Sequence, residues 1–169
     1  ALNVADRLNG QGFFVSVSVL GEDVETEAEA KAAVTEYRAL LLALHDRHIR
    51  GDVSLKLTQF GLSVSEALCK AAVLEVVMEA KHLGLFVWVD METSVTTPFA
   101  VGFYGALLKA YDGVGLALQA CLRRTPEDLA HVISAGGRVR LVKGVYRESL
   151  ADAFQKKSEV DAAYDVLMD

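Results

Sequence analysis

Charged and amide side chains recur along this chain in or just after short apolar runs. Glu22 follows the first run, Lys56 lies in the second, Asp90 ends the third and Gln119 ends the fourth. By subtraction, Glu22, Lys56 and Asp90 are evenly spaced, 34 residues apart, close to the length of one strand-plus-helix unit. An ion within an apolar strand is costly unless it is paired or binds a ligand. These residues predict a polar site to which successive strands each contribute.

The densest of these stretches, VRLVKGVY, ends at Tyr146 and places two cations in a β-branched run. Alternate residues of a strand point to the same face, so Arg140, Val142, Gly144 and Tyr146 should share one face and Lys143 should lie on the other. We therefore expect Arg140 to face the site and Lys143 to pair with an acid of a covering helix.

Five strand-like segments alternate with five segments of helical periodicity, and no hairpin signal joins two strands. A capping box of Ser63 and Glu66 is expected to start the second helix. The expected strands are 13–22, 52–58, 85–92, 114–122 and 139–145, and the expected helices are 25–49, 64–83, 98–111, 126 onward and 156 onward.

This alternation predicts an α/β fold with a parallel sheet and crossover helices. A doubly wound sheet would carry a glycine-rich phosphate turn after its first strand, and VLGEDVET is not one. Functional groups at the ends of successive strands instead favour a (β/α)8 TIM-type barrel, of which about five βα units are covered. Five strands cannot close such a barrel, so residues 1–169 are expected to be a partial barrel domain that lacks the C-terminal strands. The missing initial methionine and the uncapped final helical stretch lead to the same expectation of a longer protein.

Composition narrows the classes of function. The net charge is −6 without a basic run, which argues against a nucleic-acid partner. The two cysteines lack zinc spacing, and His45 and His48 are better explained as a basic helix end than as a metal site, so no metal is expected. No apolar run reaches about 18 residues. We expect a cytoplasmic protein and leave open peripheral association with the inner membrane.

The segments SVLGE, SLKLTQFGL, VDMETS, LQACLRR and VRLVKGVYRE, in this order, resemble the proline dehydrogenase family of FAD-dependent barrel enzymes. The resemblance implies oxidation of L-proline to Δ1-pyrroline-5-carboxylate, with hydride transfer from proline C5 to flavin N5. It also implies reoxidation by a quinone or another acceptor, and a pyrroline-5-carboxylate dehydrogenase as a partner or fused domain. The sequence differs from the family pattern at Thr93, Cys121 and Val145.

The resemblance also implies residue roles. Lys56 would lie near the flavin and the substrate carboxylate, and Asp90 would be the active-site aspartate, as an orienting group. Tyr146 would pack by the substrate ring. Glu22 would match an acid that pairs with a substrate-binding arginine outside this chain.

The same resemblance assigns the cofactor contacts. Gln119 would contact the flavin ring and Arg140 would lie near flavin N5. Gly144 would let the backbone approach the ring closely because it has no Cβ. The backbone expected to run along FAD is that of Val142, Lys143, Gly144 and Val145.

Two alternatives remain at this point. The first is a Schiff-base aldolase or decarboxylase on the same barrel, with Lys56 or Lys143 as the covalent amine. The second is an inactive fragment that lacks the substrate-clamping arginines and persists only by association with its missing half or another copy.

Overall fold

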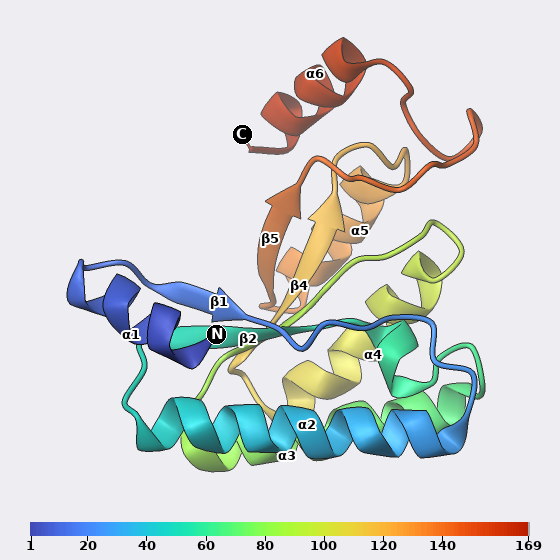
Figure 1. Ribbon diagram of the computed structural model, residues 1–169. Coiled ribbons are helices and arrows are strands. Elements are labelled where there is room, and N and C mark those ends of the chain that lie inside the picture. The colour runs from blue at the N-terminus through green and yellow to red at the C-terminus, as the bar shows by residue number, and fades with distance from the viewer. Residues whose placement is uncertain (169) are drawn as a thin grey trace.

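The computed structural model describes residues 1–168 and shows five parallel strands that alternate with helices (Figure 1). The strands lie in the sheet in their chain order, so each pairs only with its neighbours in sequence. The elements are α1 (Leu2–Gly10), β1 (Val15–Val17), α2 (Glu27–Asp46), β2 (Gly51–Leu55), the 3₁₀ turn η1 (Leu57–Phe60), α3 (Glu66–Leu83), β3 (Val87–Val89), α4 (Thr97–Ala110), β4 (Val114–Gln119), α5 (Thr125–Ser134), β5 (Arg138–Val142) and α6 (Lys157–Met168).

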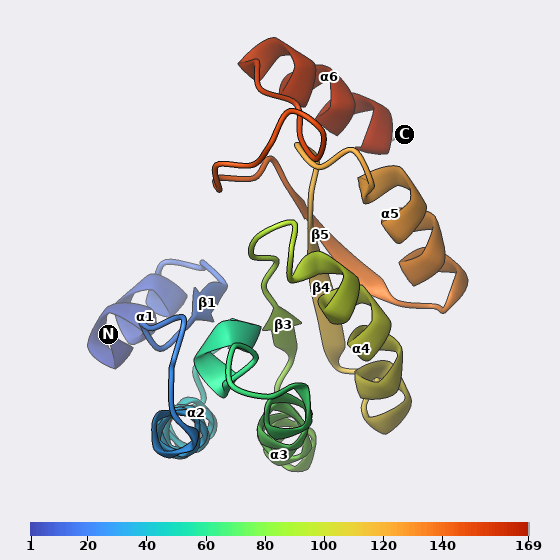
Figure 2. The same cartoon turned by 90° about the vertical axis from the view of Figure 1, so that its right-hand side faces the viewer.

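The sheet is curled, and its helices lie on the outside of the curve (Figure 2). Helices α2 to α5 form an outer arc around the strands, and α6 lies at the end of the arc beyond α5. Strands β1 and β5 are the two edges of the sheet, and neither has a second strand partner within residues 1–168. This half-barrel confirms the predicted class, a TIM-type barrel of which five βα units are covered.

The hydrophobic core lies between the convex face of the sheet and the helical arc. Alternate residues of the strands, such as Val53, Leu55, Val87, Val89 and Leu116, are almost completely buried there. Because side chains alternate across a strand, the residues between them point to the concave face. Burial of one set of alternate residues against the helices therefore determines which residues point to the concave face.

Local signals fix where the helices begin. Thr26 and Glu29 form a reciprocal capping box at the start of α2. The box expected at Ser63 is wrong, because Ser65 caps α3 by accepting from the Leu68 amide and the chain before it still turns. Among the described residues, no helix is both long and apolar enough to cross a membrane.

The strands are shorter than expected. Strand β2 ends at Leu55, and the next residues form the turn η1, which closes at Gly61 with φ of 81°. Strand β5 ends at Val142 and not at Val145. Loops at the carboxyl ends of the strands thus begin earlier, and they carry several of the polar residues that the sequence placed in strands.

Helix α1 was not among the expected elements. It packs beside β1, where the Asn9 side-chain amide donates to the backbone oxygens of Phe13 and Arg50. Arg47 at the end of α2 also pairs with Asp6 of α1. These polar contacts attach α1 to the edge of the sheet.

Candidate functional site at the carboxyl ends of the strands

Polar side chains gather on the concave face toward the carboxyl ends of β2, β3 and β5. Parallel strands end at the same edge of a sheet, so residues far apart in sequence meet there. Ser54 of β2, Asp90 directly after β3 and Arg140 of β5 all lie on this face. The structure thus brings Asp90 and Arg140, which the sequence assigned to the same site, into direct contact.

Arg140 is held by groups from two other strands. One guanidinium nitrogen donates to Asp90 Oδ1 and to Ser54 Oγ, the latter at 3.0 Å. Ser54 Oγ also donates to the same Asp90 oxygen at 2.6 Å. The guanidinium carbon lies 5.1 Å from the centroid of the Trp88 ring, a distance at which a cation is attracted to the ring face. Both charges remain partly exposed, with 32% of the Arg140 side chain and 25% of the Asp90 side chain accessible.

Trp88 is itself fixed by its surroundings. Its indole nitrogen donates to Asp52 Oδ2 at 2.9 Å. A Cβ at Gly115 of β4 would lie 2.3 Å from the Trp88 ring, so only glycine leaves room for the ring there. The ring therefore forms a rigid platform beneath Arg140.

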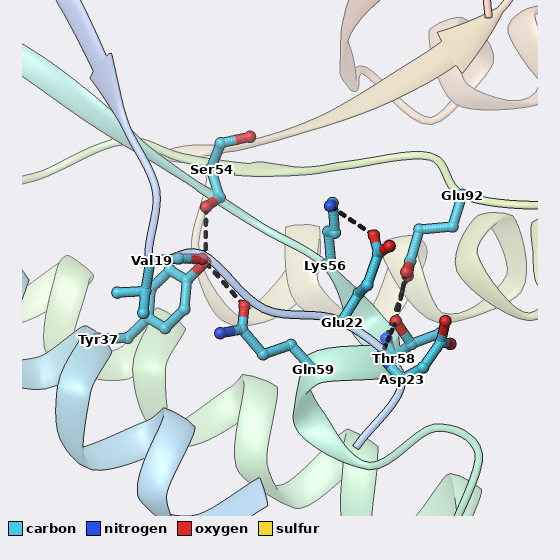
Figure 3. A network of polar contacts seen from close by, with 9 residues as sticks. All are labelled: Val19, Glu22, Asp23, Tyr37, Ser54, Lys56, Thr58, Gln59 and Glu92. Carbon is cyan, nitrogen blue, oxygen red and sulfur yellow. Dashed lines mark hydrogen bonds and ion pairs between the residues drawn. The ribbon is translucent and has the colours of Figure 1, made fainter. Parts of the chain in front are cut away.

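Lys56 and Glu22 form a second charged pair beside this cluster (Figure 3). Lys56 Nζ lies 2.7 Å from Glu22 Oε2, and both side chains are partly exposed. The hydrogen bond with Glu22 raises the pKa of Lys56, so the amine stays a cation. Sequence reasoning assigned Glu22 to an arginine outside this chain, whereas in this structure Lys56 is its partner.

Tyr146 reaches the same region from the loop after β5. Burial raises the pKa of its phenol, while the nearby Lys56 cation acts in the opposite direction. Glu148 of this loop accepts hydrogen bonds from Ser94 N at 2.8 Å and Ser94 Oγ at 2.5 Å. The loop that carries Tyr146 is thus tied to the loop after β3.

Gln119 is buried where β4 meets the loop after β5. Its Nε2 donates to the Glu92 backbone oxygen at 2.6 Å. Gly144 has φ of +100°, and a Cβ there would lie 2.3 Å from Cys121 Sγ and 3.0 Å from Gln119 Oε1. Glycine at this position is required by packing against β4, a reason that the sequence did not reveal.

The other residues at the end of β5 and in the following loop have different environments. Val142 is half-buried in β5, and Val145 is exposed in the loop. Lys143 Nζ lies 2.5 Å from Asp161 Oδ1 of α6 and 5.6 Å from the centroid of the Tyr164 ring. The expected pairing of Lys143 with a helix acid is confirmed, and only its backbone remains for the predicted cofactor contact.

Glu92 is a residue of this site to which sequence reasoning gave no role. It is 5% exposed, and its carboxylate accepts from the backbone nitrogen of Thr58 at 3.1 Å and from the Thr58 hydroxyl. Desolvation raises the pKa of Glu92. Its spacing of two residues from Asp90, on the same face of an extended chain, was the available signal.

Comparison with known proteins agrees with this architecture. The family model described as Proline dehydrogenase matches residues 1–169. Proline dehydrogenase 2 of Bacillus subtilis (strain 168) is 34% identical over 158 residues, covering 94% of this chain and 52% of that protein. Proline dehydrogenase 1 of the same strain is 30% identical over 168 residues, covering 99% of this chain and 56% of that protein.

A solved structure shows the same fold at lower identity. Proline utilization A (PutA) from Bdellovibrio bacteriovorus, inactivated by N-propargylglycine, superposes with a TM-score of 0.87 at 23% identity. The match covers 99% of this chain and 22% of that one. The chain spans about half the length of the Bacillus relatives. The family match over the whole chain, together with the half-barrel, establishes that this chain belongs to the proline dehydrogenase family.

Proposed function

We propose that the protein to which this chain belongs oxidises L-proline to Δ1-pyrroline-5-carboxylate with bound FAD. The observation that carries the proposal is the meeting of Lys56, Asp90 and Arg140 at the carboxyl ends of three strands of a half-barrel in this family. In this fold, groups at that end of the barrel perform the chemistry.

The residues of the concave face fit a flavin. Arg140 and Lys56 place two cations at the carboxyl ends of their strands, and residues 143–145 are exposed in the loop after β5. Gln119 is almost fully buried, and its Nε2 donates to the Glu92 backbone oxygen. Bound FAD would supply the acceptor for a hydride from proline C5, and fixed cations favour the negative charge of a reduced ring.

The chain's own residues would bind and orient the substrate. Lys56 is a fixed cation that would attract the proline carboxylate, which would replace Glu22 as the partner of the amine or share the amine with it. Asp90 would hold the Arg140 guanidinium in one orientation near flavin N5. Tyr146 would pack against the substrate ring. Positioning of this kind can contribute much of the rate without a covalent intermediate.

The electron acceptor and partners belong to the same proposal. A quinone is the natural acceptor for electrons held near a membrane, which agrees with a cytoplasmic protein in peripheral contact with the inner membrane. The product would be passed to a pyrroline-5-carboxylate dehydrogenase, as a partner or a fused domain. The likeness to proline utilization A supports the same barrel for this segment.

The Schiff-base alternative is disfavoured by the state of both lysines. A Schiff-base lysine needs a neutral amine, for which its pKa must be lowered. Here ion pairs with Glu22 and Asp161 raise the pKa of Lys56 and Lys143, respectively.

An anaerobic absorption spectrum of the full-length protein, recorded before and after L-proline, tests the proposal. Flavin bands that bleach with proline would support it, and a protein that binds FAD but is not bleached by proline would contradict it. Arg140→Met should lower turnover or flavin affinity. Arg38→Met is the matched control, because the ion pairs of Arg38 within residues 1–168 are with Glu75 and Glu79 on the outer helix α3. Unchanged turnover and flavin affinity in Arg140→Met would refute the role of Arg140.

A further inference from the structure

We propose that Glu92 is a positioning residue of the proline site. Through Thr58, its carboxylate fixes the loop that carries Glu22 against the turn that follows Lys56. This inference rests on the proposed function, because it assigns a use to the Lys56–Glu22 pair. The residues involved lie together in one network (Figure 3).

Both oxygens of Glu92 are engaged by one residue. Glu92 Oε2 accepts from the Thr58 backbone nitrogen at 3.1 Å, and Oε1 accepts from the Thr58 hydroxyl. An ionised carboxylate only accepts, so the Thr58 hydroxyl donates in the second bond, while its oxygen accepts from the Asp23 backbone nitrogen at 3.0 Å. A carboxylate can accept two donors here, whereas the amide of glutamine offers one acceptor oxygen.

Thr58 holds the loop after β1 at two successive residues. Besides the bond from Asp23, its backbone oxygen accepts from the Val24 nitrogen at 3.2 Å. Asp23 has φ of 52°, a left-handed conformation that aspartate adopts more readily than most non-glycine residues but still at a cost. The bonds to Thr58 offset this cost and select one shape of the loop.

The neighbouring Gln59 and Tyr37 restrain the start of the same loop. A Cβ at Gly21 would lie 2.6 Å from Gln59 Nε2, so the loop backbone runs directly over this side chain. The Tyr37 hydroxyl, from α2, donates to the Ser54 backbone oxygen at 2.9 Å and lies 3.3 Å from Gln59 Oε1. Glu22 is thus fixed from both sides.

The clamp therefore sets the position of the charged pair. Glu22 directly precedes Asp23, and Lys56 lies two residues before Thr58, at the residue that caps η1. The Glu92 backbone oxygen also accepts from Gln119 of β4. One buried residue after β3 thereby connects the ends of β1, β2 and β4, and the 2.7 Å distance between Lys56 and Glu22 depends on this connection.

The test compares three variants of the full-length, FAD-loaded protein. Thr58→Val removes the hydroxyl at constant volume, Glu92→Gln removes one acceptor, and Thr58→Ser is the conservative rescue because it keeps the hydroxyl. The measurements are hydrogen–deuterium exchange of residues 20–25 and the separate kcat and KM for L-proline. The exchange measurement does not depend on activity.

We expect Thr58→Val to raise both loop exchange and the KM for proline by at least about tenfold, because it removes both hydrogen bonds of the Thr58 hydroxyl, to Glu92 and from Asp23. The kcat should change less than the KM, because Lys56 acts on the carboxylate and not on the reacting carbon. Glu92→Gln should also raise loop exchange and KM. Thr58→Ser should have loop exchange and a KM close to those of the unmodified protein. If Glu92→Gln fails to fold, the two Thr58 variants still decide the question.

The inference would be overturned if loop exchange in Thr58→Val equalled that of the unmodified protein. It would also be overturned if Thr58→Ser raised loop exchange and KM as much as Thr58→Val does. A rise in exchange without any change of KM would overturn it as well, since the clamp would then be only structural. Failure of the unmodified, FAD-loaded protein to oxidise proline is a different result. It would refute the proposed function, while the exchange data would still report on the clamp.

Discussion

Replacement of Gly144 by alanine adds only a methyl group, yet it should strongly lower the free energy of unfolding. The new Cβ would lie 2.3 Å from Cys121 Sγ and 3.0 Å from Gln119 Oε1, and the residue has φ of +100°. A left-handed backbone costs a non-glycine residue about 1–2 kcal/mol. Forcing a methyl group into packed surroundings costs about 1–3 kcal/mol more. We therefore expect a loss of about 2–5 kcal/mol in the free energy of unfolding.

Gly136→Ala is the matched control. Gly136 also has a positive φ, of +76°, but no atom lies within 4 Å of the position of its Cβ. It should show the backbone cost alone, so the difference between the two variants measures the clash with β4. Cys121→Ala in the Gly144→Ala background should recover part of that difference.

The assay is urea unfolding of the full-length protein, with FAD affinity measured on the same samples. Equal destabilisation by Gly144→Ala and Gly136→Ala would refute the packing argument. Failure of Cys121→Ala to recover any stability would show that the contact with sulfur is not the cause. Unchanged FAD affinity in a destabilised Gly144→Ala protein would separate the packing role of Gly144 from its predicted place beside the cofactor.

Three further changes test other parts of the site. Asp90→Asn weakens the interaction with Arg140 and should lower the free energy of unfolding by about 1–2 kcal/mol. It should also alter the absorption spectrum of bound flavin. An unchanged free energy of unfolding and an unchanged spectrum would contradict the orienting role of Asp90. Lys143→Met should leave flavin affinity unchanged, because its side chain pairs with Asp161 away from the concave face, and a loss of flavin would show that this side chain is required. Burial raises the pKa of Glu92 above its ordinary 4.5, so the folded state holds this proton more tightly than the unfolded state. Stability should therefore fall as pH rises above about 4.5, and urea titrations at several pH values should show a weaker fall for Glu92→Gln; equal slopes would refute this.

The fold class was accessible from sequence because its signals are local. Apolar periodicity changes from that of a strand to that of a helix five times along the chain, and each change is contained within a few residues. The alternation of faces in the last strand likewise predicted that Arg140 and Lys143 separate, and the structure places them with Asp90 and Asp161, respectively.

The turn η1 could not be predicted from the sequence, because tertiary packing determines its conformation. Leu57 to Phe60 continue a β-like pattern in sequence, yet all four are buried in a 3₁₀ turn that Gly61 ends. Burial against α2 and α3 overrides the local preference. The hydrogen bonds between Thr58 and Glu92 depend on this turn and could not be predicted for the same reason.

The partner of Glu22 could not be found either, since it depends on the register between β1 and β2. The regular interval between Glu22 and Lys56 placed them in equivalent parts of successive units. It did not show that the loop after β1 bends back over η1, which requires the left-handed Asp23. The spacing of residues along the chain predicts which residues occupy equivalent positions in successive βα units. Which of them form ion pairs is decided by contacts between loops.

The order of the strands in the sheet has a consequence for how this protein is made. Each strand pairs only with the strand of the adjacent unit, so a newly synthesised chain can add one unit at a time as it leaves the ribosome. Each pairing nevertheless joins residues 23 to 36 positions apart, because a helix lies between successive strands, and parallel pairing over such distances is slow. Within residues 1–168, β1 and β5 each have one edge without a strand partner, and such an edge is a template for pairing with another nascent chain. The brevity of β1, three residues long, limits that hazard at the edge that is made first.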